Sequence, residues 1–220
     1  MTVMKESVSK TLSSDLYGLI KSDIINGRFA PGDKLRTEVL RTLYQVGNSP
    51  LREALTRLAA TGLINQENQR GFRIPPVSSA DLQDICACRM QIEVAALQRA
   101  IEKGDDRWEA DLLGAFHRLK KSQQNAQVGT AHWEKRHSEF HRALISECAS
   151  PTYLRFCAIL HDQFDRYRRL APSDDNIRAQ LDSQHLQIME LALARKADAA
   201  GELLAEHIQL SAASAFKLFA

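Results

Sequence analysis

The chain opens with hydrophobic positions in a helical pattern. Its apolar side chains recur there every three or four residues: Leu12, Leu16, Leu19, Ile20 and Ile24. This spacing predicts an amphipathic helix that ends near Gly27. A turn at Pro31–Gly32 follows. A second, short helix is expected over about residues 36–44, marked by the apolar side chains Leu35, Val39, Leu40 and Leu43.

A third helix is predicted over residues 48–61, directly after a tight link. Asn48 or Ser49 can cap its start, and Pro50 fits the first turn, where its missing N–H costs nothing. Thr61–Gly62 ends it. The inward positions are then Leu51, Leu55, Leu58 and Ala59, and the outward positions are Asn48, Ser49, Arg52, Thr56 and Arg57.

Two short apolar segments come next and predict a β-hairpin. They are residues 63–66 and 72–74, joined by a polar connection that ends at Gly71. Two short helices over about 36–60, followed by a hairpin over about 63–75, form the pattern of a winged helix-turn-helix. That fold places one helix, here residues 48–61, in a groove of DNA.

The segment Pro75–Ser79 predicts a domain boundary, because two prolines stop the strand and a serine can start a helix. We therefore expect a DNA-binding domain over 1–77 and a second domain over 78–220. The second domain shows almost only helical patterns, joined by short links that indicate antiparallel packing in a bundle. The fold class is mainly α, and the expected helices span about 80–103, 107–126, 130–148, 151–170, 174–195 and 197–218.

Charge is divided unevenly between these two parts. The chain carries a net charge of only +2, but residues 1–77 hold eleven Lys/Arg against seven Asp/Glu, and the remainder holds eighteen against twenty. The basic excess lies where the DNA-binding pattern lies, as attraction to phosphate requires. No apolar run is long enough to span a bilayer, no signal peptide opens the chain, and the four cysteines lie within helical patterns. We expect a cytoplasmic protein with reduced thiols and no membrane partner.

The outward face of the 48–61 helix holds the first candidate site. Arg52 can reach a guanine edge or a phosphate in the major groove. Asn48 and Ser49 lie at the helix start, where base edges or a phosphate would be met. The full set of predicted DNA-binding residues is Arg36, Gly47, Asn48, Ser49, Arg52, Arg57, Arg70 and Gly71.

Histidines in the second domain form another candidate site. His137 and His141 are four residues apart, so both project from one face of a helix. His185 and His207 each lie among apolar residues of later helices. If the four converge, they can bind a divalent metal; otherwise they are separate hydrogen-bonded or exposed side chains. The other histidines, which show no such pairing, are interpreted as surface or packing residues: His117, His132 and His161.

Arg89 is followed four residues later by Glu93, and this pair has two interpretations. It is either an ion pair on a solvated helix face or an inward arginine that can bind a carboxylate ligand. Arg166, Arg168 and Arg169 could add positive charge. The chain holds no glycine-rich phosphate loop, no GxSxG and no HExxH motif, so we expect neither an enzyme nor an organic cofactor.

With these residues laid out, the chain resembles the GntR family of bacterial transcription regulators, in its FadR-like branch with an FCD ligand-binding domain. The N-terminal part is similar to the family in Pro31–Leu35, in Pro50–Leu55 and in Gly62–Ile64. The C-terminal part is similar to the FCD pattern in Arg89 with Glu93, His137–His141, His185 and His207.

The resemblance implies a homodimer whose recognition helices bind a palindromic operator in double-stranded DNA. It also implies a small carboxylate effector, bound near Arg89, His141, His185 and His207 in the helical domain. Many FCD domains hold a metal through one Asp and three His. Here His141, His185 and His207 match the three histidine positions, and His137 stands where the family has Asp. The expected ion is zinc or nickel, although imidazole also suits copper and iron.

We therefore predict a ligand-responsive transcription regulator, a repressor, with an effector-binding bundle that holds a divalent metal. Asn48 stands where the family often has an arginine shortly before its proline. An Asn amide prefers an adenine edge, so we expect the operator to differ from the usual half-site of the family. The alternatives are a helical-bundle metalloenzyme, or a metal sensor, with an accessory winged domain.

Overall fold

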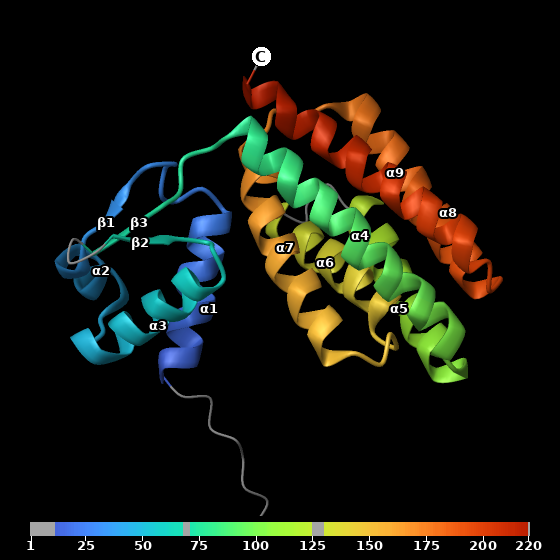
Figure 1. Cartoon of the computed structure of the whole chain (residues 1–220), viewed down its shortest axis with the longest axis horizontal. Coiled ribbons are helices and arrows are strands. Elements are labelled where there is room, and N and C mark those ends of the chain that lie inside the picture. Colours follow the sequence, from blue (N-terminus) through green and yellow to red (C-terminus); the bar gives the residue numbers. More distant parts are fainter. Residues whose placement is uncertain (1–11, 68–70, 125–129, 220) are drawn as a thin grey trace, which may run out of the picture. The chain divides into compact units, whose positions relative to one another are not determined.

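The computed structural model describes residues 12–67, 71–124 and 130–219 (Figure 1). The chain forms two compact units that divide between Ser78 and Ser79. The first unit combines three helices with a small sheet, and the second is helical.

The first unit has helices α1 (Leu12–Ile25), α2 (Thr37–Tyr44) and α3 (Asn48–Ala60), and strands β1 (Lys34–Leu35), β2 (Asn65–Glu67) and β3 (Gly71–Arg73). The sheet is antiparallel in the order β1-β3-β2, with Phe72 opposite both Leu35 and Gln66. The predicted hairpin is β2–β3, and the predicted helix-turn-helix is α2–α3.

The core of this unit explains why α3 is held firmly. Leu51, Leu55 and Leu58 lie on one side of the helix and are buried, while Arg52 and Thr56 remain exposed. Apolar side chains of α1, of the sheet and of the residue after β3 complete the cluster, among them Ile20, Ile24, Leu35, Phe72 and Ile74. Burial of one face leaves the opposite face of α3 for a partner.

Some local predictions for this unit are wrong. Leu35 belongs to strand β1 and not to the predicted helix. It pairs with Phe72 of β3, and the backbone N–H of Ile74 donates a hydrogen bond to the Asp33 carbonyl beside this pair. Val39 is 58% exposed, although it shares the apolar pattern of buried Leu40. Helix α3 starts at Asn48, and Gly47 occupies the N-cap position with no side-chain cap, so neither Asn48 nor Ser49 caps the helix.

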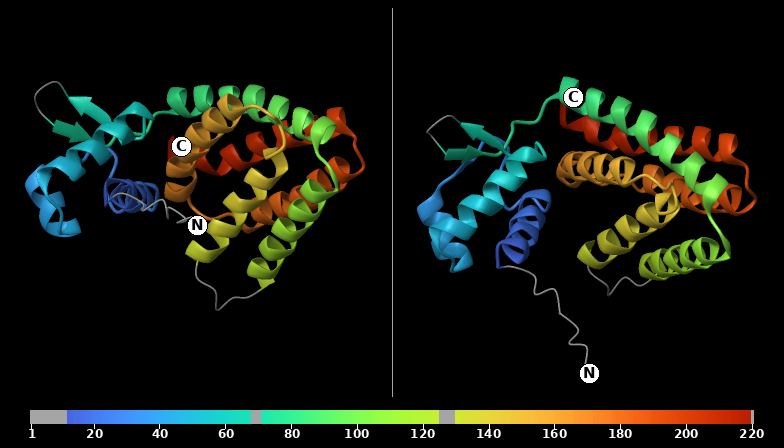
Figure 2. Two further views of the ribbon diagram at one scale, coloured as in Figure 1. Left: turned by 90° about the horizontal axis from the view of Figure 1, so that it is seen from below. Right: turned by 60° about the horizontal axis from the view of Figure 1, so that its bottom comes forward.

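The second unit consists of α4 (Ser79–Lys103), α5 (Asp106–Gln124), α6 (Thr130–Ile145), α7 (Pro151–Leu170), α8 (Asp175–Leu193) and α9 (Ala197–Phe216). Helix α4 packs along α7 and α9, α5 packs on α6, and α8 packs on α9 (Figures 1 and 2). The prediction of an all-helical bundle is confirmed. Within the described residues, no helix is both long and apolar enough to cross a membrane.

Local chemistry fixes the start of two of the helices that line the site described below. Ser150 accepts a hydrogen bond from the backbone N–H of Tyr153, and Pro151 opens α7. Asp174 accepts from the N–H groups of Asn176 and Ile177 at the start of α8. These caps satisfy donors that a helix leaves free and so set where each helix begins.

Candidate functional site

Four histidines converge inside the helical unit. His137 and His141 come from α6, His185 from α8 and His207 from α9. One ring nitrogen of each lies within 4.8 Å of the corresponding nitrogens of the other three. All four side chains are buried. The structure therefore brings together the four histidines that the sequence analysis singled out.

The hydrogen bonding of these imidazoles is incomplete. The Nε2 atoms of His137 and His141 lie 3.1 Å apart, and Nδ1 of His207 lies 3.2 Å from Oε1 of Gln184. Nδ1 of His137 and both ring nitrogens of His185 are buried without a hydrogen-bond partner among the described residues. Buried polar atoms are normally satisfied, so such a concentration of unpaired nitrogens indicates a ligand.

Burial keeps these imidazoles neutral. It lowers the pKa of His137, His141 and His207 well below the ordinary value of 6.5, and the positive charges of neighbouring histidines and of Arg89 or Arg168 lower it further. For His185, burial and then Arg168 lower the pKa to about 3. Neutral imidazoles have a lone pair available at neutral pH, which metal coordination requires.

The donor set fits a divalent transition metal. Zinc is bound by four nitrogen or sulfur ligands in most structural sites, and four imidazoles on three helices supply that number. Gln184 lies beside Nδ1 of His207 and so leaves Nε2 for the cluster, as an outer-shell partner does. His137, His141, His185 and His207 are the residues that would hold the ion.

A small cavity adjoins the cluster, and Arg89 is one of its walls. Arg89 and Glu93 are both buried, which excludes the solvated ion pair that the sequence left open. Arg89 donates Nε–H to Oε1 of Glu93 over 2.7 Å and Nη2–H to Oε2 over 3.2 Å, and its guanidinium lies over the ring of Phe164. Among the described residues, Nη1 has no hydrogen-bond partner, so this part of the guanidinium remains available to a carboxylate.

Arg168 also lines the cavity, but its donors are used. It donates Nε–H to Asp165 over 2.9 Å and both terminal nitrogens to the carboxylate of Glu134. Arg169 lies 3.5 Å from the same Glu134 carboxylate. Although burial opposes it, the charge of Arg168 helps to lower the pKa of Asp165 to about 2, so Asp165 is ionised at neutral pH. Arg166 is placed differently, 3.9 Å from Asp81.

His161, which the sequence analysis did not include in the site, packs against two of the four histidines. His161, on α7, lines the cavity, and its ring centre is 5.9 Å from that of His141 and 6.2 Å from that of His137. Its Nε2 atom is buried without a hydrogen-bond partner among the described residues. No spacing in the sequence relates α7 to α6, so this position could not be found from periodicity. His117 and His132 are exposed, as expected.

The candidate DNA-reading surface lies on α3. Asn48, Ser49 and Arg52 are exposed, and no ion pair joins Arg52 to any described residue. Gly47 at the N-cap position provides no side-chain acceptor, so the first backbone N–H groups of α3 remain for a phosphate. The exposed surface thus offers both a guanidinium and a helix N-terminus.

The remaining predicted DNA-binding residues lie in different environments. Arg36 is exposed at the start of α2. The guanidinium of Arg57 lies 4.5 Å from the ring centre of Tyr17, so Arg57 helps to hold α1 against α3. Gly71 has a φ of 96°, a conformation that favours glycine, at the start of β3. Arg70 lies outside the described residues.

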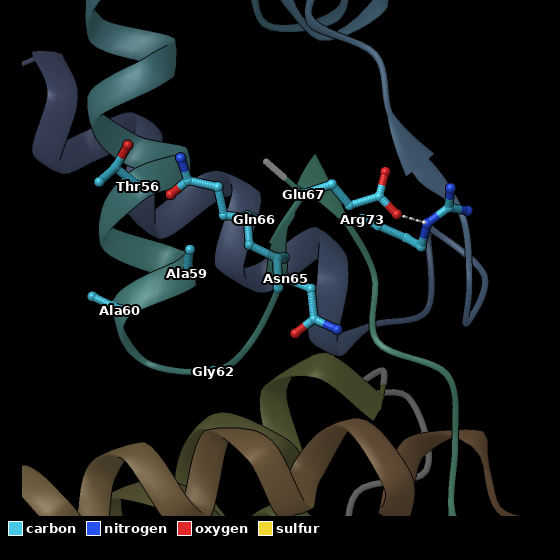
Figure 3. A pocket seen from close by; sticks show the side chains of 9 residues that line it. Thr56, Ala59, Ala60, Gly62, Asn65, Gln66, Glu67 and Arg73 are labelled. Atoms are coloured by element: carbon cyan, nitrogen blue, oxygen red, sulfur yellow. Dashed lines mark hydrogen bonds and ion pairs between the residues drawn. The ribbon is translucent and has the colours of Figure 1, made fainter. Parts of the chain in front are cut away.

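An open hollow lies between α3 and β2 (Figure 3). Thr56, Ala59 and Ala60 line it from α3, and Asn65 and Gln66 line it from β2. The Arg73 guanidinium pairs with Glu67 over 2.6 Å and donates to the Gly32 carbonyl, which braces the sheet. Of these, only Thr56 was recognised as outward-facing from the sequence, because the hollow needs the folded hairpin.

Two protein-family models match this chain, one in each of its two compact units. Residues 12–74 match the family model described as bacterial regulatory proteins of the gntR family, and residues 84–210 match the model of the FCD domain.

Individual proteins are similar over nearly the whole chain. The uncharacterized HTH-type transcriptional regulator BphR of Paraburkholderia xenovorans (strain LB400) is 36% identical over 92% of this chain and 84% of its own length. The HTH-type transcriptional repressor GlaR of Escherichia coli (strain K12) is 36% identical over 89% of this chain and 92% of its own. The solved structure of E. coli McbR/YncC has a TM-score of 0.81 at 20% identity, and covers 96% of this chain and 99% of its own.

Proposed function

The chain belongs to the GntR family of bacterial regulatory proteins with an FCD domain, and on this basis we propose that it is a dimeric repressor whose operator binding is controlled by a small carboxylate effector held beside a divalent metal. The family makes it a DNA-binding transcription regulator. The similarity to GlaR, whose name describes that protein as a repressor, supports the proposed sign of regulation. A protein that binds operator DNA acts in the bacterial cytoplasm, which is therefore its proposed location.

Operator recognition is assigned to α3. Arg52 is exposed on the face opposite the buried leucines and can approach a guanine edge in the major groove. Asn48 and Ser49 are placed to meet bases or a phosphate near the helix start. A homodimer would present two such helices to the two halves of a palindrome.

The metal proposal rests on one observation. Four buried imidazoles, all with a depressed pKa, bring their nitrogens within 4.8 Å of one another, and several of those nitrogens have no hydrogen-bond partner among the described residues. A bound divalent ion would satisfy them and would act as a Lewis acid toward an oxygen ligand. Zinc or nickel suits an all-imidazole set.

The charge of the site favours an anionic effector. By the family resemblance, His137 stands where many FCD domains have an Asp, and four neutral imidazoles contribute no negative charge. Arg89 adds a guanidinium with one side available, while Glu93 holds it in place. A carboxylate bound here would compensate positive charge that the protein leaves uncompensated.

Control of DNA binding requires differential affinity. The effector must bind one arrangement of the dimer more tightly than another, and the coupling free energy equals that difference. In this proposal, the effector site in the helical unit biases the relative placement of the two α3 helices.

The experiment is selection of operator DNA from a random library by the zinc-loaded full-length protein. The selected duplex is then titrated at fixed salt in the presence of acetate, lactate or succinate, with and without chelator. We expect a palindromic consensus, and we expect at least one acid to weaken binding only when zinc is present. Failure to enrich any sequence would contradict the operator assignment.

The same titration separates the alternatives. A metal sensor would respond to chelation alone, with no effect of any acid. A metalloenzyme would consume the acid and would bind the selected duplex no better than unrelated DNA.

A further inference from the structure

The rings of the four histidines are held in place by different contacts. A histidine that binds a metal usually has its second ring nitrogen held by a hydrogen-bond acceptor, which fixes the ring. His207 has such a partner, because its Nδ1 atom lies 3.2 Å from Oε1 of Gln184. His137 has none: its Nε2 atom lies 3.1 Å from Nε2 of His141, and its Nδ1 atom is buried without a hydrogen-bond partner among the described residues. Another contact must therefore fix the ring of His137.

Trp133 makes that contact. It comes one turn before His137 on α6, so the two side chains lie on the same face of the helix. Their rings are stacked, with centres 4.8 Å apart and planes only 16° from parallel. By contrast, His141 and His185 meet His137 edge-on, each at an interplanar angle of 67°. The indole therefore lies flat against the imidazole and restrains the tilt of its plane.

Trp133 is itself held from two other helices. The guanidinium carbons of Arg168, on α7, and of Arg178, on α8, lie 5.7 and 5.3 Å from the centre of its ring. The electrons of an indole face attract such cations. Arg168 is fixed in turn by the carboxylate of Glu134, which accepts from both of its terminal nitrogens. Side chains from three helices thus set the position of the indole that lies against His137.

We infer that Trp133 is a positioning residue of the metal site, and that its indole holds the His137 imidazole with Nε2 toward the cluster in place of a hydrogen bond at Nδ1. The inference rests on the proposed function, because it assumes that the four histidines hold a divalent ion. Trp133 is not a ligand itself, since an indole nitrogen only donates hydrogen bonds. It acts through His137, by reducing the freedom that this ligand loses when the ion binds.

The zinc affinity of the full-length protein, measured by competition with a chromophoric chelator, tests this role. Trp133→Ala should bind zinc at least about threefold more weakly than wild type, because one aromatic stack contributes a factor of that order. Trp133→Phe keeps a ring beside the imidazole and should recover most of the wild-type affinity. Phe156→Ala removes an exposed aromatic side chain from α7 and is the matched control, which should bind zinc as wild type does.

Tryptophan fluorescence distinguishes contact with the site from a general effect on stability. The chain has two tryptophans, Trp108 and Trp133. An open-shell ion such as Ni²⁺ quenches the emission of an indole close to it, so saturating nickel should quench the emission of wild type. Because Trp133 lies directly against a ligand, Trp133→Phe should lose most of this quenching, whereas Trp108→Phe should keep most of it.

Three results would overturn the inference. They are wild-type zinc affinity in Trp133→Ala, affinity in Trp133→Phe as low as in Trp133→Ala, and nickel quenching that survives in Trp133→Phe but disappears in Trp108→Phe. If Trp133→Ala does not fold, the fluorescence comparison of the two phenylalanine variants decides. Wild-type protein that binds neither zinc nor nickel would instead contradict the metal part of the proposed function, and the positioning role with it.

Discussion

At the scale of single residues, the two candidate sites consist of side chains with opposite environments. Arg52 is exposed on α3 and is available to a partner. The four histidines are buried and have neutral imidazoles because burial lowers each pKa. Exposure suits a residue that meets DNA, and burial suits a residue that binds a metal.

Arg52→Ala should weaken sequence-specific operator binding and leave the fold intact, because the side chain is exposed on α3. Loss of one good base contact costs about 1–3 kcal/mol, so affinity for the selected duplex should fall about five- to 150-fold. Competition gel shifts at fixed salt measure this. Arg107→Ala removes the same charge from an exposed position on α5 and should leave specificity unchanged. Wild-type specificity in Arg52→Ala would refute the assignment of α3.

At the scale of elements, the turns and caps position the site as much as the helices do. The α4–α5 corner contains Gly104, and a Cβ there would lie 2.3 Å from Cε3 of Trp108 and 2.8 Å from the carbonyl oxygen of Ala100. Trp108 is buried and donates its indole N–H to the Ala143 carbonyl of α6 over 2.9 Å. Through this contact the corner fixes the helix that carries His137 and His141.

Gly104→Ala should therefore destabilise the protein, by about 1–3 kcal/mol for an overpacked position. Gly18→Ala is the contrasting change. It lies within α1, a Cβ there meets nothing within 4 Å, and it should stabilise by about 0.5–1 kcal/mol. Urea unfolding followed by circular dichroism measures both. Equal stability of the two variants would show that the corner is not tightly packed.

The sequence predicts these elements better than it predicts their contacts. Long helices and the β2–β3 hairpin follow from periodicity, and so does the facing pair His137 and His141. Strand β1 is only two residues long, so Leu35 gave no β pattern and was assigned to a helix. His161 was missed because its neighbours in the cavity come from other helices, a relation that spacing along one helix cannot contain.

The site illustrates the same limit. Convergence of His185 and His207 with the α6 pair follows from the family resemblance, not from spacing alone. The spacing of Arg89 and Glu93 fixed their pairing but not their burial, because the side of α4 that faces the bundle depends on α7 and α9. Likewise, the outward position of Arg57 was clear, but its stacking on Tyr17 required the folded α1.

At the scale of the whole molecule, the buried histidines link stability to pH. Their pKa values are lowered in the folded protein, so the unfolded chain binds more protons below its ordinary histidine pKa of 6.5. Stability is therefore fully present above about pH 6.5 and decreases as the pH falls. For His185 the loss continues down to about pH 3.

Metal-free protein should consequently lose stability as the pH falls from about 6.5 to 5, at up to about 1.4 kcal/mol per pH unit for each such histidine. Urea unfolding at a series of pH values measures the slope. His185→Leu removes one of the four groups and should reduce the slope by roughly one such increment, whereas exposed His132→Leu should not. A free energy of unfolding that is constant over this range would contradict neutral burial of the cluster.

The most direct test of the account is the metal content of the full-length protein after incubation with equimolar zinc and gel filtration, measured by inductively coupled plasma mass spectrometry. Wild type and His132→Ala should hold about one zinc per chain, and His141→Ala should hold clearly less, because the loss of one of four ligands weakens the site. Only trace zinc in wild type, or full zinc in His141→Ala, would contradict the assignment of the four histidines.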